Sequence, residues 1–273
     1  MHDLCVVTAC DLNELYFALT CDLLASIRAS PQHARTPAFV INGGMHPEQQ
    51  AVLTRGYAVA EIVDPSDMLA TRGWAFDVGT RPYVGMIARA YIPVLFPGFR
   101  YYLYLDGDTW VHDEGVIERY VALSARQGVS AARVESECFR EAEGCTRAVI
   151  CDEMWDESAF RAQPYVCSGA FCVDADSDVF AQLQDAGERN RARGVRFFTE
   201  QSLFNVVYSA RETLDFADNF LLSRRTPRLD AAGRLADPLT GRLIGLVHLS
   251  GSIKHALADA DLPLRYRDWV GAK

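Results

Sequence analysis

Two aspartates separated by one glycine are the residues of this sequence that most directly suggest chemistry. Asp106 and Asp108 end the apolar run of "YYLYLDGDTWV". Residues two apart on an extended strand point the same way and lie about 6.6 Å apart along the backbone, so both carboxylates can face one cation. Without a cation they would repel each other. The spacing therefore favours a site for Mg²⁺ or Mn²⁺, which take further oxygen ligands, commonly from phosphates.

An Asp-Gly turn is the main structural alternative, because this dipeptide is a common hairpin signal. Two features weaken it: the preceding strand is apolar throughout rather than alternating, and "TWV" continues in extended character beyond the acids. A calcium-binding loop is excluded, since its third ligand position holds Trp110, its glycine position Val111 and its twelfth position Ile117.

Composition limits the classes of protein to consider. The 273 residues are 49% hydrophobic, enough to bury the core of one large α/β domain. A formal net charge of −9 argues against a nucleic-acid partner. The eight cysteines show no metal or redox spacing, which indicates reduced, buried thiols. With no signal-like start and no run of 18 apolar residues, we expect a cytoplasmic protein without an integral membrane segment.

The first part of the chain alternates between strand and helix patterns. A strand is predicted over 4–9, and then a helix capped by Asp11 with Glu14 as its capping-box partner. Further strands are predicted over 37–42 and 58–64. The helix between them is expected to start with Pro47 in its first turn and to end at Gly56. This order indicates a βαβ sheet.

The aspartates follow the next such unit. Residues 83–96 are predicted to be helical until Pro93, and 101–105 to form a central strand that is apolar on both faces. The acids then stand at the carboxyl end of a strand, the edge where open α/β sheets bind ligands. Residues 135–163 carry many acids and no clear period, so we expect a functional loop or lid there. Strand character resumes at 168–175 and again within 245–251.

Five segments, in order, resemble the motifs of glycosyltransferase family 8, the family of glycogenin and of bacterial lipopolysaccharide galactosyl- and glucosyltransferases. "LYLDGDTWV" resembles the DxD motif of GT-A glycosyltransferases, and the helix before it resembles the family's arginine-bearing helix. The other resembling segments are "VVTACDLN", "YVCSGAFCVD", "FFTEQSLFN" and "HLSGSIKH". The resemblance spans residues 4 to 255.

The resemblance implies four groups of site residues. The implied metal ligands are Asp106, Asp108 and His248. The implied nucleotide- and diphosphate-binding residues are Thr8, Ala9, Asp11, Asn13, Arg89, Gly107, Gly251 and Lys254. The implied donor-sugar residues are Cys167, Ser168 and Gly169, and the implied catalytic residues are Glu200 and Gln201.

Three positions depart from the family pattern. Cys167 replaces an asparagine, Ser202 replaces the last acid of an Asp-Gln-Asp stretch, and His255 with Ala256 replaces a Pro-Trp pair. The cysteine stands beside the expected donor sugar. The choice between glucose and galactose is therefore not readable from the sequence.

The implied fold is a single GT-A, Rossmann-like α/β domain over residues 1–273, with a mixed, mainly parallel sheet and with 135–163 as an acceptor-side insert. The implied enzyme is a metal-dependent hexosyltransferase that uses Mn²⁺ or Mg²⁺. It moves glucose or galactose from a UDP-sugar to the hydroxyl of a saccharide, protein or small-molecule acceptor. The resemblance further implies retention of anomeric configuration.

Simpler interpretations stand beside these roles. His248 alone could be a hydrogen-bonded histidine at a strand end, and Glu200 could complement a helix dipole. Arg89 could be an ion-pair partner, and Gln201 an ordinary helix residue. Two other functions compete with sugar transfer. A nucleotidyltransferase would need a glycine-rich basic loop after the first strand, and "TACDLNE" has neither feature. The second competing function is that of a protein that binds a nucleotide sugar without turning it over.

Overall fold

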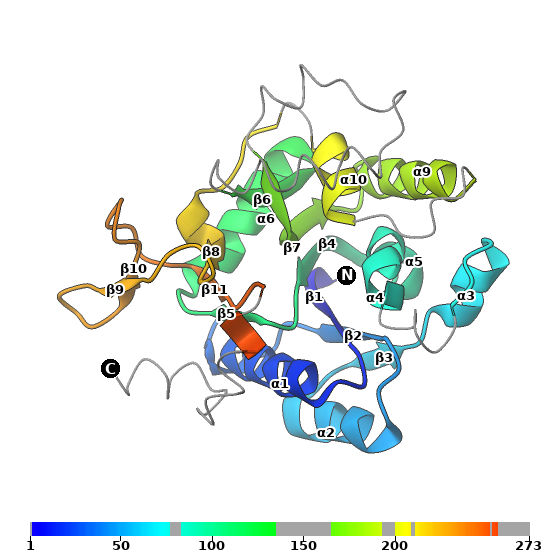
Figure 1. The fold of residues 1–273 in the computed structure, drawn as a ribbon, viewed down its shortest axis with the longest axis horizontal. Helices are drawn as coiled ribbons and strands as arrows, with labels where there is room; N and C mark the ends of the chain where they lie inside the picture. The colour runs from blue at the N-terminus through cyan, green and yellow to red at the C-terminus, as the bar shows by residue number, and fades with distance from the viewer. Residues whose placement is uncertain are drawn as a thin grey trace.

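A six-stranded sheet, called the large sheet below, runs through the described chain with the strand order β3-β2-β1-β4-β7-β6 (Figure 1). Strands β3 to β4 are mutually parallel, whereas β7 is antiparallel to both β4 and β6. The predicted mixed, mainly parallel α/β sheet is therefore confirmed. In chain order its strands are β1 (His2–Cys10), β2 (Ala38–Asn42), β3 (Glu61–Val63), β4 (Phe99–Leu105), β6 (Val129–Arg133) and β7 (Val166–Asp174).

The computed structural model describes residues 2–76, 83–134, 165–192, 200–208, 211–251 and 253–255. The predicted acceptor-side loop 135–163 lies outside these residues. The helices of the described ranges are α1 (Glu14–Ala29), α2 (Pro47–Tyr57), α3 (Ser66–Thr71), α4 (Val84–Ala88), α5 (Ile92–Leu95), α6 (Gly115–Gln127), α9 (Val179–Ala192) and α10 (Glu200–Val207). Among them none is both long and apolar enough to cross a membrane.

Alternate side chains of β4 enter two different cores. Tyr102 and Tyr104 pack with apolar residues of α4, α5, α9 and α10. Tyr101, Leu103 and Leu105 pack on the opposite face with residues of α1 and α6. All five residues are buried, as expected for a central strand covered on both faces. The rigid centre of the sheet thus carries the chain directly to Asp106.

A second sheet, called the small sheet below, continues from the turn after β4. It consists of β5 (Thr109–Val111), β11 (Leu246–His248) and β8 (Phe220–Leu221), with β11 in the middle. Strand β11 is antiparallel to β5 and parallel to β8. The predicted extended segment after the acids and the predicted strand within 245–251 are therefore confirmed, and the two pair with each other.

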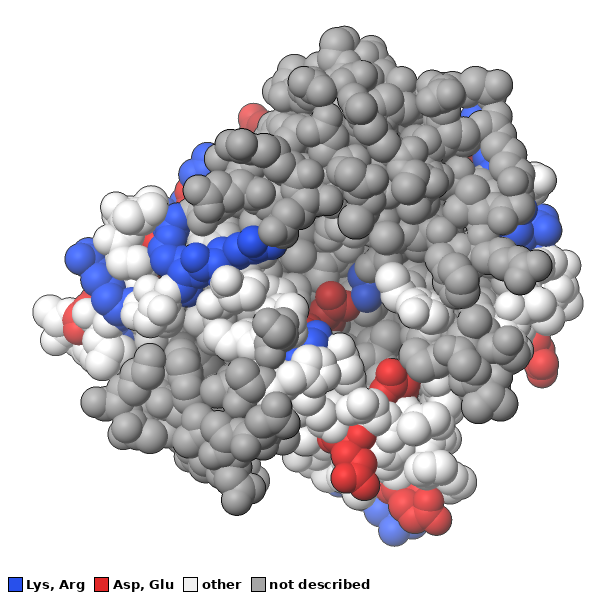
Figure 2. Space-filling view, in the orientation of Figure 1, with Lys and Arg blue, Asp and Glu red and all other residues white. Residues whose placement is uncertain are grey.

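Beside the small sheet, β9 (Arg228–Leu229) and β10 (Leu235–Ala236) form a hairpin (Figure 1). Figure 2 shows Lys and Arg side chains gathered over this part of the molecule.

The predicted cap of the first helix was wrong. Asn13 caps α1, because its Oδ1 accepts from the backbone N–H groups of Leu15 at 3.0 Å and Tyr16 at 3.3 Å. Glu14 is already the first helical residue. Asp11 lies two residues before the cap, and its carboxylate instead accepts from the N–H of Asn13 at 2.8 Å. Asp11 therefore fixes the turn that leads into the helix.

Two predicted helix ends were also wrong. The region before β4 is broken into α4, a 3-10 turn at Arg89–Tyr91 and α5. Pro93 stands in the first turn of α5, where a missing N–H costs nothing, so it does not end the helix. Gly56 lies inside α2, and Ala58, at φ 52°, is the C-cap. Pro47 does occupy the first turn of α2, as predicted.

Candidate functional site

The Asp-Gly-Asp segment is a turn that joins the two sheets. The backbone N–H of Asp106 donates to the carbonyl of Gly169 in β7 at 2.7 Å, and Asp108 accepts at its carbonyl from Leu249 at 2.9 Å. The N–H of Thr109 closes the turn on Asp106 at 3.0 Å. The turn alternative was therefore correct for the backbone. It is not a hairpin, because β4 and β5 belong to different sheets.

The turn brings together the predicted metal-ligand residues. One carboxylate oxygen each from Asp106 and Asp108 and one ring nitrogen of His248 all lie within 4.8 Å of one another. His248 ends β11, which pairs with β5 directly after Asp108. Two carboxylates and one imidazole form a ligand set that suits Mn²⁺ and is compatible with Mg²⁺. The donor set therefore fits a divalent metal ion.

Asp106 and its partners at the end of strand β4 of the large sheet are called the Asp106 side of the site below. The Oδ1 of Asp106 accepts from Arg89 Nη2 at 2.6 Å and from the hydroxyl of Tyr104 at 3.0 Å. The guanidinium of Arg89 also stands over the Tyr104 ring, 4.4 Å from its centre. Burial raises the pKa of Asp106, because Arg89 offsets only part of the cost of desolvating its charge.

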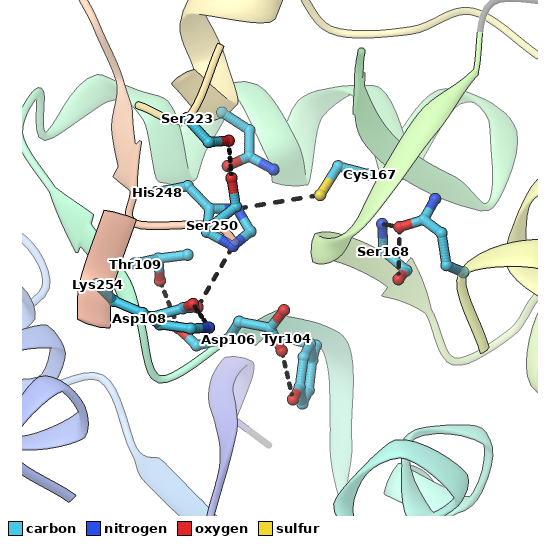
Figure 3. Close-up of polar contacts among 12 residues, drawn as sticks. Tyr104, Asp106, Asp108, Thr109, Cys167, Ser168, Ser223, His248, Ser250 and Lys254 are labelled. Carbon is cyan, nitrogen blue, oxygen red and sulfur yellow. Dashed lines mark hydrogen bonds and ion pairs between the residues drawn. The ribbon is translucent and has the colours of Figure 1, made fainter. Parts of the chain in front are cut away.

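Asp108 and its partners, which lie beside strands β5 and β11 of the small sheet, are called the Asp108 side below (Figure 3). Lys254 Nζ donates to Asp108 Oδ2 at 2.6 Å, and His248 Nε2 lies 3.3 Å from Oδ1. Burial opposes the charge, but His248 and Lys254 together hold the pKa of Asp108 well below its usual range. Burial likewise opposes charge on His248, yet Asp108 raises its pKa well above the ordinary value. Two cations thus neutralise this carboxylate.

A cavity of about 400 Å³ opens onto both aspartates. Seven of its lining residues were predicted as site residues, namely Ala9, Asp11, Arg89, Asp106, Gly107, Asp108 and Lys254. They come from the end of β1, the 3-10 turn before α5, the Asp-Gly-Asp turn and the short helical segment 253–255. Figure 2 shows acidic and basic side chains meeting near the centre of this face.

Other residues that line the cavity were missed by sequence reasoning. They are Cys10, Tyr16, Gly43, Tyr83, Gly85 and Met86. Tyr16 supports Lys254 directly, since the ammonium stands 4.5 Å from the centre of its ring. Its place in the first turn of α1, at the ligand edge of the sheet, is the signal that could have identified it.

Two predicted donor-sugar residues lie against the metal-ligand residues. A Cβ on Gly169 would stand 2.5 Å from both Asp106 Oδ2 and His248 Cε1, so only glycine fits there. The thiol of Cys167 lies 4.0 Å from His248 Nδ1. Gly107 is packed in the same way, because an added Cβ would collide with the hydroxyl of Thr20. These positions set the shape of the site.

Ser168 and Gln201 form a unit next to the cluster. The side-chain carbonyl of Gln201 accepts from the Ser168 backbone N–H at 2.8 Å and from its hydroxyl at 2.9 Å. The Gln201 amide also donates to the carbonyl of Val166. Gln201 is therefore fixed to β7, while the side chain of Glu200, the first residue of α10, lies outside the described residues.

Three predicted nucleotide-binding residues do not line the cavity as described. Thr8 is buried within β1, and Asn13 is exposed and occupied as the cap of α1. Gly251 is exposed, with φ +69°, a left-handed conformation that favours glycine.

Comparisons with known proteins identify the fold. The chain resembles the galactosyltransferase LgtC, solved with donor and acceptor sugar analogs, at 18% identity and a TM-score of 0.60, over 90% of this chain and 87% of LgtC. It resembles the bifunctional glycosyltransferase WbbM at 16% identity and a TM-score of 0.61, over 98% of this chain and 51% of WbbM. Mouse xyloside xylosyltransferase 1 matches at 12% identity and a TM-score of 0.54, over 91% of this chain and 98% of that chain.

No protein-family model and no curated protein sequence matches the chain. At these identities the structural likeness shows the fold alone. The predicted GT-A fold, with its two aspartates at the end of a sheet strand, is therefore confirmed.

Proposed function

We propose that the chain is a metal-dependent glycosyltransferase of family 8 type, which moves a hexose from a UDP-sugar to an acceptor hydroxyl. The observation that carries the proposal is the convergence of Asp106, Asp108 and His248 on one point beside a 400 Å³ cavity. The proteins of this fold named above are glycosyltransferases. LgtC itself was solved with donor and acceptor sugar analogs.

The proposed donor site places the diphosphate against the cluster. Asp106, Asp108 and His248 would hold Mn²⁺ or Mg²⁺, and the ion, when bound, supplies positive charge to the departing diphosphate. Lys254 and Arg89 already face the two carboxylates and line the cavity, so both can turn a cation toward phosphate oxygens. Ala9 and Asp11, which line the cavity, are proposed for the nucleoside, and Gly107 for close backbone approach. Thr8, Asn13 and Gly251 are not among the described lining residues, so no direct contact is proposed for them.

The proposed transfer retains anomeric configuration. The bond between the anomeric carbon and the diphosphate oxygen breaks while the acceptor oxygen bonds to the same face of that carbon. The acceptor proton then passes to the leaving phosphate oxygen. The Gln201 carbonyl, which accepts from Ser168, is proposed to stabilise positive charge on the sugar, and Glu200 is proposed to orient sugar hydroxyls. One solved structure of LgtC carries an active-site glutamine-to-glutamate substitution, so the active site of that protein contains a glutamine.

Cellular location and domain organisation belong to the same proposal. The described cysteines, Cys5, Cys10, Cys21, Cys167 and Cys172, are free thiols, which supports a reducing compartment such as the cytoplasm. Residues 1–273 are proposed as one glycosyltransferase domain, with the acceptor side at 135–163.

Calorimetric titration of UDP tests the donor site without knowledge of the acceptor. We expect the wild-type protein to bind UDP with Mn²⁺ and to lose most of this binding in chelator. Asp106→Asn and Asp108→Asn, checked for folding by circular dichroism, should bind weakly under both conditions. Absence of UDP binding by folded wild-type protein with Mn²⁺ or Mg²⁺ would refute the proposal. A positive result leads to a screen of UDP-sugars, with NMR of the product to determine the anomeric configuration.

A further inference from the structure

The His248 ring has a polar partner on each of its two nitrogens. Nε2 lies 3.3 Å from Asp108 Oδ1 and faces the metal cluster. Nδ1 lies on the other side, 3.1 Å from the side-chain oxygen of Asn219. His248 and Asn219 are almost fully buried, at 4% and 1% exposure. Solvent therefore has little access to the contact between Nδ1 and Asn219.

These contacts decide which nitrogen can bind a metal ion. A coordinating nitrogen needs a free lone pair, and a neutral imidazole carries its single proton on the other nitrogen. With Nε2 facing the cluster, the proton must stay on Nδ1, where the Asn219 oxygen can accept it. If the amide were reversed, its NH₂ group would donate to Nδ1. The ring proton would then be forced onto Nε2, which would close that nitrogen to the ion.

The thiol of Cys167 is the other neighbour of Nδ1, at 4.0 Å. Sulfur is a weak acceptor, and this distance is at the limit of a sulfur hydrogen bond. Asn219 is therefore the group that can hold the Nδ1 proton.

The fold holds Asn219 firmly in this place. It is the last residue of the 3-10 turn Phe216–Asn219, which Asp215 and Asp218 fix by a capping box. Strand β8 follows directly and pairs with β11, so that His248 stands opposite Leu221. The Asn219 NH₂ group, in contrast, has no hydrogen-bond partner among the described residues. Such a buried polar group costs stability, which indicates that the asparagine is kept for its contact with the ring.

We propose that Asn219 is a positioning residue that keeps the proton of His248 on Nδ1 and so presents Nε2 to a divalent metal ion. The inference rests on the proposed function and adds to it a residue that no motif of the sequence suggested. Outer partners of metal-bound histidines commonly change metal affinity 10- to 100-fold when they are removed.

Two substitutions of Asn219 test the proposal. Asn219→Leu keeps the size of the side chain but removes the acceptor, and we expect Mn²⁺ affinity, measured by calorimetry without nucleotide, to fall about 10- to 100-fold. Asn219→Asp keeps an acceptor at the same place and should restore affinity to within a few-fold of wild type. Thermal unfolding in chelator checks that each variant is folded at the temperature of the titration, which separates metal binding from folding.

The position of the ring proton gives a second readout that does not depend on activity. With ¹⁵N-labelled histidine and saturating Mg²⁺, a diamagnetic ion, wild-type His248 should show a protonated Nδ1 and an unprotonated Nε2. Its signal is assigned by its loss in His248→Gln. At the Mg²⁺ concentration that saturates the wild type, Asn219→Leu should bind less of the ion and show a mixture of tautomers, whereas Asn219→Asp should show the wild-type pattern.

The possible failures are distinguishable. Wild-type metal affinity and an unchanged tautomer in Asn219→Leu would overturn the role of Asn219 and leave the proposed function standing. A folded wild-type protein that binds neither Mn²⁺ nor Mg²⁺ would overturn the metal site, and the inference with it. Metal binding without UDP binding would overturn only the proposed glycosyl transfer.

Discussion

The Asp106 side and the Asp108 side of the site differ although the two acids are neighbours in sequence. Asp106 directly follows the buried strand β4 of the large sheet and has one cation, Arg89, with a raised pKa. Asp108 begins the small sheet and has two cations, with a lowered pKa. The large sheet therefore supplies a carboxylate that is short of positive charge, and the small sheet one whose charge is already matched. A divalent ion would therefore add the missing positive charge at Asp106, whereas at Asp108 it would compete with the two cations already present.

Replacing each acid by its amide should separate the two sides most strongly. Asp108→Asn leaves Lys254 and His248 buried without their anion, and we expect it to lower the free energy of unfolding of the metal-free protein by about 3 kcal/mol. Asp106→Asn also removes a carboxylate that burial disfavours, so its cost should be about 1 kcal/mol. Urea unfolding in chelator measures both. Equal losses would contradict the difference in charge balance between the two sides.

Gly169 stands between the two sides, and a methyl group there should disturb both. Gly169→Ala places a Cβ against Asp106 and His248, so we expect a loss of about 2 kcal/mol and at least a 10-fold weaker affinity for Mn²⁺. Gly56→Ala is the matched control, because a Cβ at Gly56 meets no atom within 4 Å and lies in helix α2. The control should gain up to about 1 kcal/mol. Normal metal affinity in Gly169→Ala would show that the side chains around the cluster can move to accommodate the added methyl group.

The Asp108 side should also make stability depend on pH. The pKa of His248 is raised by Asp108, so the stability that its charged ring contributes is present below about pH 6.5 and is lost as pH rises through the folded-state pKa. Between pH 6.5 and 8.5 we expect the metal-free wild type to lose up to about 1.4 kcal/mol per pH unit. Asp108→Asn should be flatter, since His248 then has no anion on Nε2. The free energy of unfolding of both proteins, measured across this pH range, tests the prediction. If it changed equally with pH in the wild type and in Asp108→Asn, the His248–Asp108 pair would not be the cause.

The two sheets were not equally predictable from the sequence. The strands of the large sheet, such as β1 and β4, are continuous apolar runs with helices between them, and local pattern is enough to find them. The small sheet has strands of two or three residues, and β5 pairs with a segment more than 130 positions later. Nothing local marks β8 or the pairing. The sequence therefore predicted the elements of the Asp106 side better than those of the Asp108 side.

The same limit applies to the site. The spacing of Asp106 and Asp108 and the resemblance to a known family, which added His248, led to three residues that the fold brings together. Asn219 carries no motif, since its role exists only because β8 pairs with β11 and turns its side chain to the ring. The cap at Asn13 was missed for a smaller reason: Asp11 and Asn13 are both good capping residues, and the helix start differs by only two or three positions.

Lys254 is expected to act as an internal substitute for the metal ion on the Asp108 side. Its ammonium lies 2.6 Å from Asp108 Oδ2. It therefore pairs with the negative charge that a divalent ion would otherwise bind. Lys254→Met, which keeps the stem, should therefore raise the affinity for Mn²⁺ alone about 10-fold and lower the affinity for UDP with Mn²⁺ by a similar factor. Arg89→Met is the counterpart on the Asp106 side. Calorimetry with and without UDP measures both affinities. Weaker binding of Mn²⁺ alone by Lys254→Met would contradict the idea that Lys254 takes the place of the metal ion.

The smallest expected effect is that of one hydroxyl on the Asp106 side. Tyr104→Phe removes the 3.0 Å hydrogen bond to Asp106 Oδ1, which should raise the carboxyl pKa further and cost about 1 kcal/mol. Tyr102→Phe loses an equally long bond, to the carbonyl of Phe96, on the same strand but away from the site. Both variants should lose similar stability, whereas only Tyr104→Phe should weaken Mn²⁺ binding, by a few-fold and more at low pH than at high pH. The pH matters because a carboxyl group with a higher pKa holds its proton longer against the ion. Equal metal affinity in the two variants at low pH would mean that Arg89 alone sets the charge of Asp106.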